Sequence, residues 1–165
     1  MDVIIRPLVA SDWPAVREIY LSGMAGGTAT FETEVPSWMD WDADHHSNCR
    51  LVAEDAGRVA GWLALKPISK RAAYRGVAEG SVYVHPASLR RGVAAALIRS
   101  AIPLAEAAGI YSVQASVFPE NHASLALLER HGFRRIGYRE RVARRDGVWK
   151  DNVLLERRSR LPEFN

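Results

Sequence analysis

The chain has 165 residues and a formal net charge of +3, with 48% hydrophobic and 25% charged residues. These values are ordinary for one globular domain, and a chain of this length buries enough surface to fold without a metal or disulfide staple. The single cysteine, Cys49, excludes an internal disulfide and is typical of a reducing compartment. The apolar run 93–98 is too short to cross a bilayer, and residues 1–3 lack a signal-peptide pattern. We therefore expect a cytoplasmic protein without a membrane partner.

In the first third of the chain, hydrophobic spacing predicts one strand and two helices. Residues 3–8 suit a strand, and Ser11 is placed to cap a helix whose apolar side includes Val16 and Ile19. Gly23, Gly26 and Gly27 are expected to break this helix, and a loop follows over 28–35. Ser37 is expected to cap a second helix that runs to His45.

The rest of the chain alternates strand-like and helix-like segments. The predicted elements are strands at 51–54, 59–65 and 80–84, a helix at 92–108, a strand at 111–118, a helix at 124–131, and a closing hairpin of 135–142 and 148–155. Pro103 should kink the longer helix. Helices inserted among strands predict a single α/β domain over 1–165, with a mixed sheet and helices on both faces.

Charge and histidine patterns exclude two classes of partner. Ten arginines fall between residues 130 and 160, but acidic residues are interspersed and no aromatic–basic stacking motif accompanies them. The five histidines show no metal-ligand spacing. We expect neither a nucleic-acid partner nor a metal ion.

The segment 81–97 carries the strongest chemical signal. A strand and a short loop are followed by a helix that opens with Gly92, Val93, Ala94 and Ala95. Such a helix start presents unpaired backbone N–H groups and a partial positive charge, and small residues let phosphate oxygens approach them. Arg90 and Arg91 add charge to the same loop. The pattern predicts a pyrophosphate-binding site, although a helix with an Ala-rich face packed in the core would have the same sequence.

This segment resembles the acetyl-CoA motif of the GNAT superfamily of N-acetyltransferases, Gln/Arg-x-x-Gly-x-Gly/Ala. Leu89 stands where that motif has Gln or Arg. A side-chain contact from this position is therefore not expected, whereas the backbone donors do not depend on the side chain.

The likeness extends, in order, over nearly the whole chain to one branch, the phosphinothricin and methionine sulfoximine N-acetyltransferases. The segments that carry it are 28–33, 73–84, 119–124, 128–133 and 147–151. The resemblance implies the GNAT fold, in which two central parallel strands splay apart and admit the pantetheine arm of acetyl-CoA.

The resemblance also implies which residues bind acetyl-CoA. Backbone groups of Val82, Tyr83 and Val84 would bind the pantetheine. The pyrophosphate would be held by Arg90, Arg91, Gly92, Val93, Ala94 and Ala95. Asn121 and Ser124, just before and at the start of the helix predicted at 124–131, would contact the cofactor.

The reaction needs a neutral amine, and Glu79 is the candidate general base that would remove its proton. Arg75 could bind a substrate carboxylate through two parallel hydrogen bonds. Four residues could wall the acceptor pocket, each also explicable as ordinary packing: Phe31, Glu32, Tyr74 and Trp149.

The thiolate that leaves needs a proton, and the candidates are Tyr111 and Tyr138. Cys49 and Ser116 lack a neighbouring His–acid signature, so we expect direct attack in a ternary complex and no covalent acyl-enzyme.

These observations predict an acetyl-CoA-dependent N-acetyltransferase that acts on the primary amine of a small amino-acid-like molecule. Two alternatives remain: a protein or peptide N-acetyltransferase, and a non-catalytic acyl-CoA-binding module. By analogy with the family, we expect a homodimer.

Overall fold

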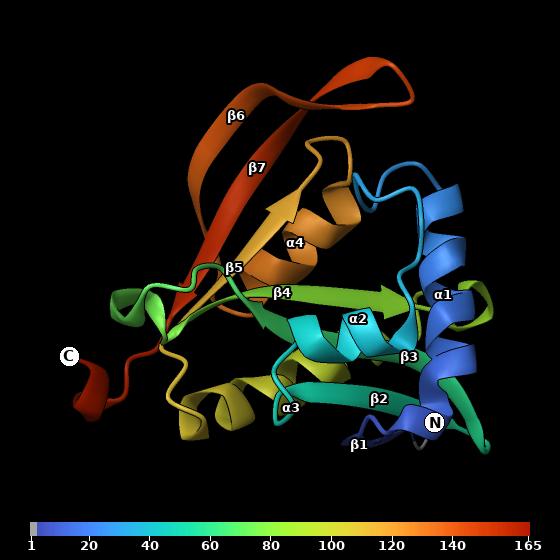
Figure 1. Ribbon diagram of the computed structural model, residues 1–165, viewed down its shortest axis with the longest axis horizontal. Helices are drawn as coiled ribbons and strands as arrows, with labels where there is room; N and C mark the ends of the chain where they lie inside the picture. The colour runs from blue at the N-terminus through green and yellow to red at the C-terminus, as the bar shows by residue number, and fades with distance from the viewer. Residues whose placement is uncertain (1–2) are drawn as a thin grey trace.

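The computed structural model describes residues 3–165, and a single twisted mixed sheet organises them (Figure 1). Its strand order is β1-β2-β3-β4-β5-β7-β6. The strands are β1 (Ile4–Pro7), β2 (Arg50–Asp55), β3 (Arg58–Pro67), β4 (Val77–Val84), β5 (Ser112–Val117), β6 (Arg134–Arg145) and β7 (Val148–Arg158). Every neighbouring pair is antiparallel except β4 and β5.

Two hydrophobic clusters cover the two faces of the sheet. The helices are α1 (Trp13–Ala25), α2 (Trp38–Asp44), α3 (Val93–Ala107) and α4 (His122–Arg130). Trp41 of α2 and Val16 of α1 pack on Trp62 of β3 in one cluster. Leu97 of α3 and Leu125 of α4 belong to the cluster on the other face. The structure thus confirms the predicted α/β fold with helices on both faces.

The parallel pair β4–β5 is joined only at its beginning. Val77, Ala78 and Glu79 pair with Ser112, Val113 and Gln114, and neither strand has a further partner in the other. Both strands nevertheless continue, β4 to Val84 and β5 to Val117. The predicted splay between two central parallel strands is therefore present, and it opens just after Glu79.

Several boundaries differ from the sequence prediction for identifiable reasons. Helix α1 ends at Ala25, before Gly26 and Gly27, but it runs through Gly23. Gly23 instead allows a close approach, because a Cβ at this position would lie 2.6 Å from the Tyr83 ring. Ser11 does not cap α1, since it lies in a 3₁₀ turn and α1 begins after Asp12. The prediction for Ser37 is confirmed, because its Oγ accepts a hydrogen bond from the amide of Asp40 at 3.2 Å.

Strand β4 begins at Val77, three residues before the predicted strand start at 80, so Glu79 lies within it. The predicted closing hairpin is confirmed, with positive φ at Asp146 and Gly147, and the turn between β2 and β3 likewise has positive φ at Ala56 and Gly57. Strands β6 and β7 are both longer than predicted, and β6 forms one edge of the sheet. Helix α3 runs through Pro103 and ends at Ala107.

Candidate active site

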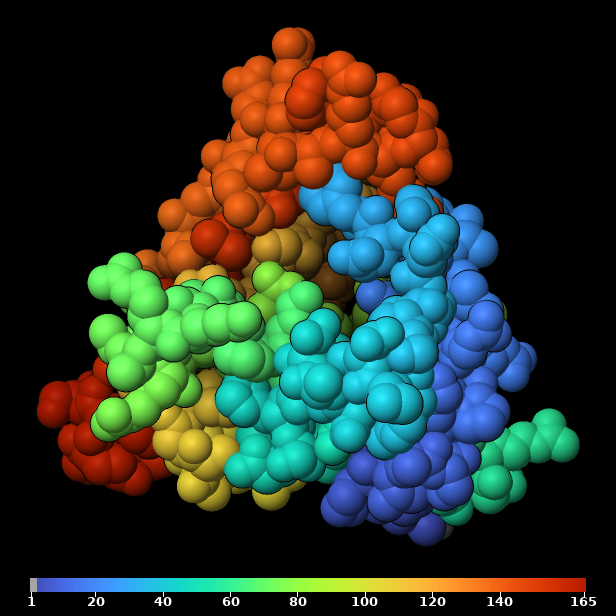
Figure 2. Space-filling model, in the orientation of Figure 1, coloured from blue at the N-terminus to red at the C-terminus, as the bar shows by residue number. Residues whose placement is uncertain are grey.

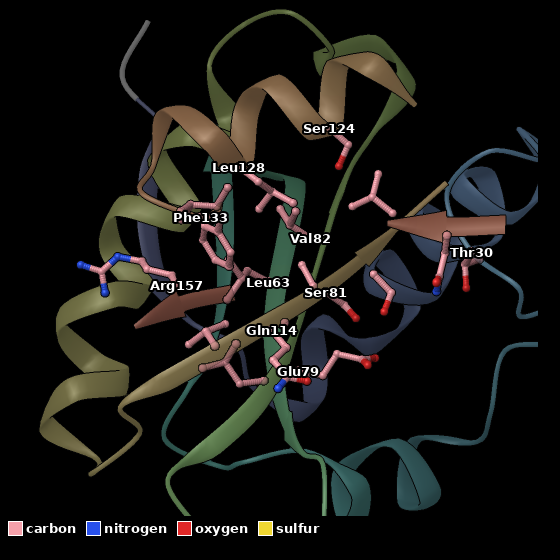
Figure 3. A pocket seen from close by; sticks show the side chains of 18 of the residues that line it. Thr30, Leu63, Glu79, Ser81, Val82, Gln114, Ser124, Leu128, Phe133 and Arg157 are labelled. Carbon is pink, nitrogen blue, oxygen red and sulfur yellow. The ribbon is translucent and has the colours of Figure 1, made fainter. Parts of the chain in front are cut away.

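A cavity of about 400 Å³ lies at the splay and is lined by residues from both faces of the sheet. Side chains alternate between the faces along a strand, so Glu79 and Ser81 face α1, while Gly80 and Val82 face α3. All four residues line the cavity, which therefore passes through the sheet (Figure 3). The space-filling view shows a hollow between the β6–β7 hairpin, the segment after α1 and the β4 side of the molecule (Figure 2).

The Glu79 carboxylate lies where the two strands begin to diverge. It is half-buried, and its neighbour on β5 is Gln114, which also lines the cavity. No ion-pair partner for Glu79 occurs among residues 3–165. A half-buried carboxylate without a cation beside it is able to accept a proton from a bound amine.

The loop between α1 and α2 covers the Glu79 side of the cavity. Its residues Phe31 and Glu32 line the cavity, as the sequence predicts, and Phe31 packs edge-on against Phe118 with centroids 4.7 Å apart. The Nδ2 of Asn121 donates to the carbonyl of Thr28 at 3.2 Å. Arg145, at the end of β6, donates to the carbonyl of Thr30 at 2.5 Å and to that of Met24. Two distant segments thus fix this loop over the site.

Arg139 of β6 is a cavity residue that the sequence did not indicate. Its Nε donates to Oδ1 of the buried Asn152 at 2.8 Å, and its Nη2 lies 3.4 Å from the Ser116 Oγ. Nη1 has no acceptor in the part of the chain that the structure describes, residues 3–165. The guanidinium is therefore held in place with donors left for an anionic ligand. No local motif marks it, because only the β5–β7–β6 pairing brings it to the cavity.

The start of α3 has the properties that a pyrophosphate requires. Gly92 precedes the helix with φ 77°, and the first helical hydrogen bond is from the Ala96 amide to the Gly92 carbonyl at 3.0 Å. The amides of Val93, Ala94 and Ala95 consequently have no acceptor among residues 3–165. A Cβ at Gly92 would meet nothing within 4 Å, so the approach to these amides is open. These open, unpaired amides fit a bound pyrophosphate.

The two arginines of this loop have different environments. The Arg91 Nη1 lies 3.1 Å from the Asp55 Oδ2, so a carboxylate already partly neutralises its charge. Arg90 has a positive φ of 60°, and no ion pair of its side chain occurs within residues 3–165. Arg90 is the freer of the two to bind an anion.

The other predicted donor-binding residues lie around the cleft. Val82 and Tyr83 line the cavity, and Val84 continues the same strand without lining it. Asn121 and Ser124 also line the cavity, but the Asn121 Oδ1 accepts from the Ser124 amide at 3.2 Å. The Asn121 side chain therefore caps α4 and holds the loop at Thr28. It would support a bound ligand chiefly by keeping these two segments in position.

Three predicted acceptor residues lie away from the cavity. Residues 72–74 form a 3₁₀ turn and Arg75 has helical φ and ψ, so Arg75 is not part of the extended strand that carries Glu79. Arg75 lines a second hollow near the C-terminus with Phe164 and with Tyr111, and Tyr111 also lines the main cavity. Tyr74 is 41% exposed, and Trp149 is 50% exposed beneath the Arg144 guanidinium.

Burial and charge shift the titration of the aromatic residues near Glu79. Burial, with the nearby Glu32 and Glu79 carboxylates, raises the pKa of Tyr20 to about 12 and raises that of Tyr83 further. Both phenols are therefore neutral at pH 7.

Residues 3–165 contain neither a reactive thiol nor a cluster of metal ligands. Burial raises the pKa of the Cys49 thiol, which is fully buried. Within residues 3–165, no three side chains of His, Cys, Asp or Glu gather as metal ligands would. No helix in the same range has the length and apolar content that a membrane span needs.

Known proteins share both the sequence and this architecture. Residues 13–133 match the acetyltransferase (GNAT) family. YwnH of Bacillus subtilis strain 168 is 36% identical over 151 residues, with 88% of this chain and 93% of YwnH covered. A protein of Alcaligenes faecalis named phosphinothricin N-acetyltransferase is 31% identical over 163 residues, with 93% of this chain and 81% of that protein covered.

A solved structure gives the same fold. The phosphinothricin acetyltransferase from Sinorhizobium meliloti in complex with AcCoA superposes with a TM-score of 0.86 at 26% identity, covering 96% of this chain and 89% of that one. The match of the family over most of the chain, together with the splayed sheet, shows that this chain belongs to the GNAT acetyltransferase family and is an enzyme.

Proposed function

We propose that the protein transfers the acetyl group of acetyl-CoA to the primary amine of a small amino-acid-like acceptor of the phosphinothricin or methionine sulfoximine type. The observation that carries this proposal is the cavity through the sheet at Glu79. The free amides of α3 lie on the donor side, and Glu79 and Arg139 lie on the acceptor side. The names of the Alcaligenes and Sinorhizobium proteins support the choice of acceptor.

Acetyl-CoA would supply an acetyl group activated as a thioester. The amides of Val93, Ala94 and Ala95, with Arg90, would hold its pyrophosphate, and the backbone of Val82 and Tyr83 would orient its pantetheine arm. Glu79 would then take the proton of the acceptor amine, directly or through a water molecule.

We propose that Arg139, rather than Arg75, binds the acidic group of the acceptor. Arg139 lines the same cavity as Glu79, whereas Arg75 lies in the other hollow. Phe31 and Glu32, in the loop between α1 and α2, would enclose the rest of the acceptor.

Tyr111 is the better of the two candidates for returning a proton to the leaving thiolate. Tyr111 lines the cavity, although its hydroxyl donates to the Ala73 carbonyl at 3.3 Å, whereas the exposed Tyr138 hydroxyl donates to Asp151 outside the cavity.

We further propose a cytoplasmic homodimer. The edge strand β6 exposes Ile136, Tyr138 and Val142, which supports a partner on this face, and the reduced Cys49 fits a cytoplasmic location. Light scattering on the purified protein should give twice the chain mass; a single chain mass at all concentrations would contradict the dimer.

Release of free CoA thiol tests the main proposal. Acetyl-CoA is supplied with phosphinothricin, methionine sulfoximine, their carboxyl amides, simple alkylamines and a short peptide. We expect turnover on the two amino acids and much weaker turnover on the amides and alkylamines. Preference for the peptide would favour a peptide N-acetyltransferase, and acetyl-CoA binding without turnover on any amine would indicate a binding module.

A further inference from the structure

The cavity continues beyond the splay into the interior between the sheet and α3. Its lining there is apolar and includes Ala101 and Ala105 of α3 and Leu128 of α4, with Phe133 after α4 (Figure 3). These residues belong to the core cluster on that face, yet they border open space. Val113 is only half-buried although β5 lies between β4 and β7. We call this interior part the inner chamber.

The inner chamber lies beyond the place that the pantetheine arm can occupy. The arm needs the gap between β4 and β5, and this gap closes where Glu79 pairs with Gln114. Ala105 is twelve residues after Val93, so it lies about 18 Å along the helix axis from the start of α3. Ile110 and Val113, at the level of the paired residues, also line the cavity. A pantetheine arm that stays within the gap between β4 and β5 would leave the inner chamber unfilled.

Gly80 keeps the passage into the inner chamber open. A Cβ at this position would lie 3.2 Å from the Leu65 Cδ2 and 3.4 Å from the Val113 Cγ1. Any larger residue would fill the narrow point between these two side chains. The absence of a side chain at Gly80 thus connects the thioester position at the splay with the apolar space behind it.

The far end of the inner chamber is polar. Glu106 and Arg157 line it and form an ion pair with a 3.3 Å distance between Oε1 and Nη1, and the Ser159 Oγ donates to the same Glu106 oxygen at 2.8 Å. An apolar chain that reached this pair would remove water from charged groups, which is costly. The inner chamber therefore suits an unbranched apolar chain of limited length.

We propose that the inner chamber binds the acyl group of donors longer than acetyl-CoA, so that the enzyme also transfers butyryl and hexanoyl groups. This inference rests on the proposed acetyl transfer. The chemistry is the same for each donor: the amine nitrogen forms a bond to the thioester carbonyl carbon, and the carbon–sulfur bond breaks. The amine proton passes to Glu79, and the thiolate of CoA takes up a proton, so that an amide and free CoA result.

Binding of the donors alone provides the first test. Calorimetric titration of the unliganded protein measures the affinities of acetyl-, butyryl- and hexanoyl-CoA. Each buried methylene should tighten binding about fourfold, so butyryl-CoA should bind on the order of tenfold more tightly than acetyl-CoA. Equal or weaker binding of butyryl-CoA would overturn the proposal.

A pair of variants on α3 locates the effect. Ala101→Leu places a larger side chain at the inner chamber wall, whereas Ala107→Leu makes the same change on the exposed side of the helix. Ala101→Leu should abolish the preference for butyryl-CoA and leave acetyl-CoA affinity within a factor of about two, as a chamber beyond the acetyl group requires. Ala107→Leu should keep the preference. Ala101→Val serves the same purpose if the larger change prevents folding, and an unchanged preference in the folded variant would contradict the inner chamber assignment.

Turnover separates this inference from the function on which it rests. With methionine sulfoximine as acceptor, the wild type should release thiol from butyryl- and hexanoyl-CoA at rates within about tenfold of acetyl-CoA. Turnover with acetyl-CoA alone would contradict only the inner chamber proposal. Absence of turnover with every donor would instead contradict the proposed acetyltransferase activity.

Discussion

The donor and acceptor ends of the cleft offer different chemical groups to a ligand: backbone amides at one end and side chains at the other. At the proposed donor end, the candidate ligand-binding groups are consecutive backbone amides at the start of α3, exposed by Gly92 and small alanines. At the acceptor end, side chains come together from separate segments: Phe31 from a loop, Glu79 from β4 and Arg139 from β6. Backbone donors do not depend on side-chain identity, so a departure from the family motif such as Leu89 leaves them in place. A site made of side chains changes with each residue that is replaced.

This contrast predicts how the two ends respond to substitution. Changes at the acceptor end should alter turnover or acceptor affinity while acetyl-CoA binding stays normal. Changes at the donor end should alter acetyl-CoA binding through backbone conformation and charge.

The largest effect is expected for Glu79→Gln. Loss of a positioned general base should lower kcat by roughly 10²–10⁴-fold. Acetyl-CoA affinity, measured by calorimetry on the same preparation, should change little because the carboxylate faces the acceptor side. Near-normal kcat across the pH range would show that another group or the solvent removes the amine proton.

The second effect concerns the donor end. Gly92→Asp should weaken acetyl-CoA binding on the order of 10²-fold, because it adds a negative charge beside the phosphate site and strains a residue with φ 77°. Gly92→Ala is the matched control, since its Cβ meets nothing within 4 Å and adds only the backbone strain. Unchanged affinity in a folded Gly92→Asp protein would contradict the assignment of this helix start.

A third, smaller effect distinguishes two arginines. Arg139→Lys should raise the acceptor KM roughly tenfold with a smaller change in kcat, because a lysine cannot keep the bond to Asn152 and offer paired donors to an acid group. Arg75→Lys, outside the cavity, should leave KM near the wild-type value. The reverse pattern in steady-state kinetics would return carboxylate recognition to Arg75.

The smallest effect is spectroscopic and tests the burial of the aromatic wall behind Glu79. Tyr20 should ionise with a pKa of about 12, so its phenolate absorbance should appear above the pH at which exposed tyrosines titrate. Because burial raises this pKa in the folded state, Tyr20 favours folding below the unfolded pKa near 10, and this contribution is lost as the pH rises from 10 to 12. Tyr20→Phe should remove the step near pH 12, while Tyr83, whose pKa burial also raises, still ionises late. An unchanged step near pH 12 would assign that step to another tyrosine.

The sequence was sufficient for the parts that depend on local pattern. The order of strands and helices, the helix start at Gly92 and the position of Glu79 beside the splay all follow from periodicity, small residues and resemblance over short segments. The predictions for Phe31 and Glu32 as cavity residues depended on resemblance, and both residues line the cavity.

The parts that depend on distant contacts were less accessible. Gly23 reads as a helix breaker until the Tyr83 ring is known to lie against it. Arg75 is close to Glu79 in sequence, but Arg75 has helical φ and ψ and lies before β4, which begins at Val77. Arg139 reaches the cavity only through the β5–β7–β6 pairing, which no local pattern encodes.

The central claim is that donor and acceptor meet at Glu79 from opposite faces of the sheet and react directly. Initial velocities measured over a grid of acetyl-CoA and methionine sulfoximine concentrations test this most directly. Double-reciprocal lines should intersect, and the intact mass of the protein should not change after incubation with acetyl-CoA alone, since Cys49 is fully buried. Parallel lines together with a stoichiometric acetyl adduct on the protein would contradict the claim.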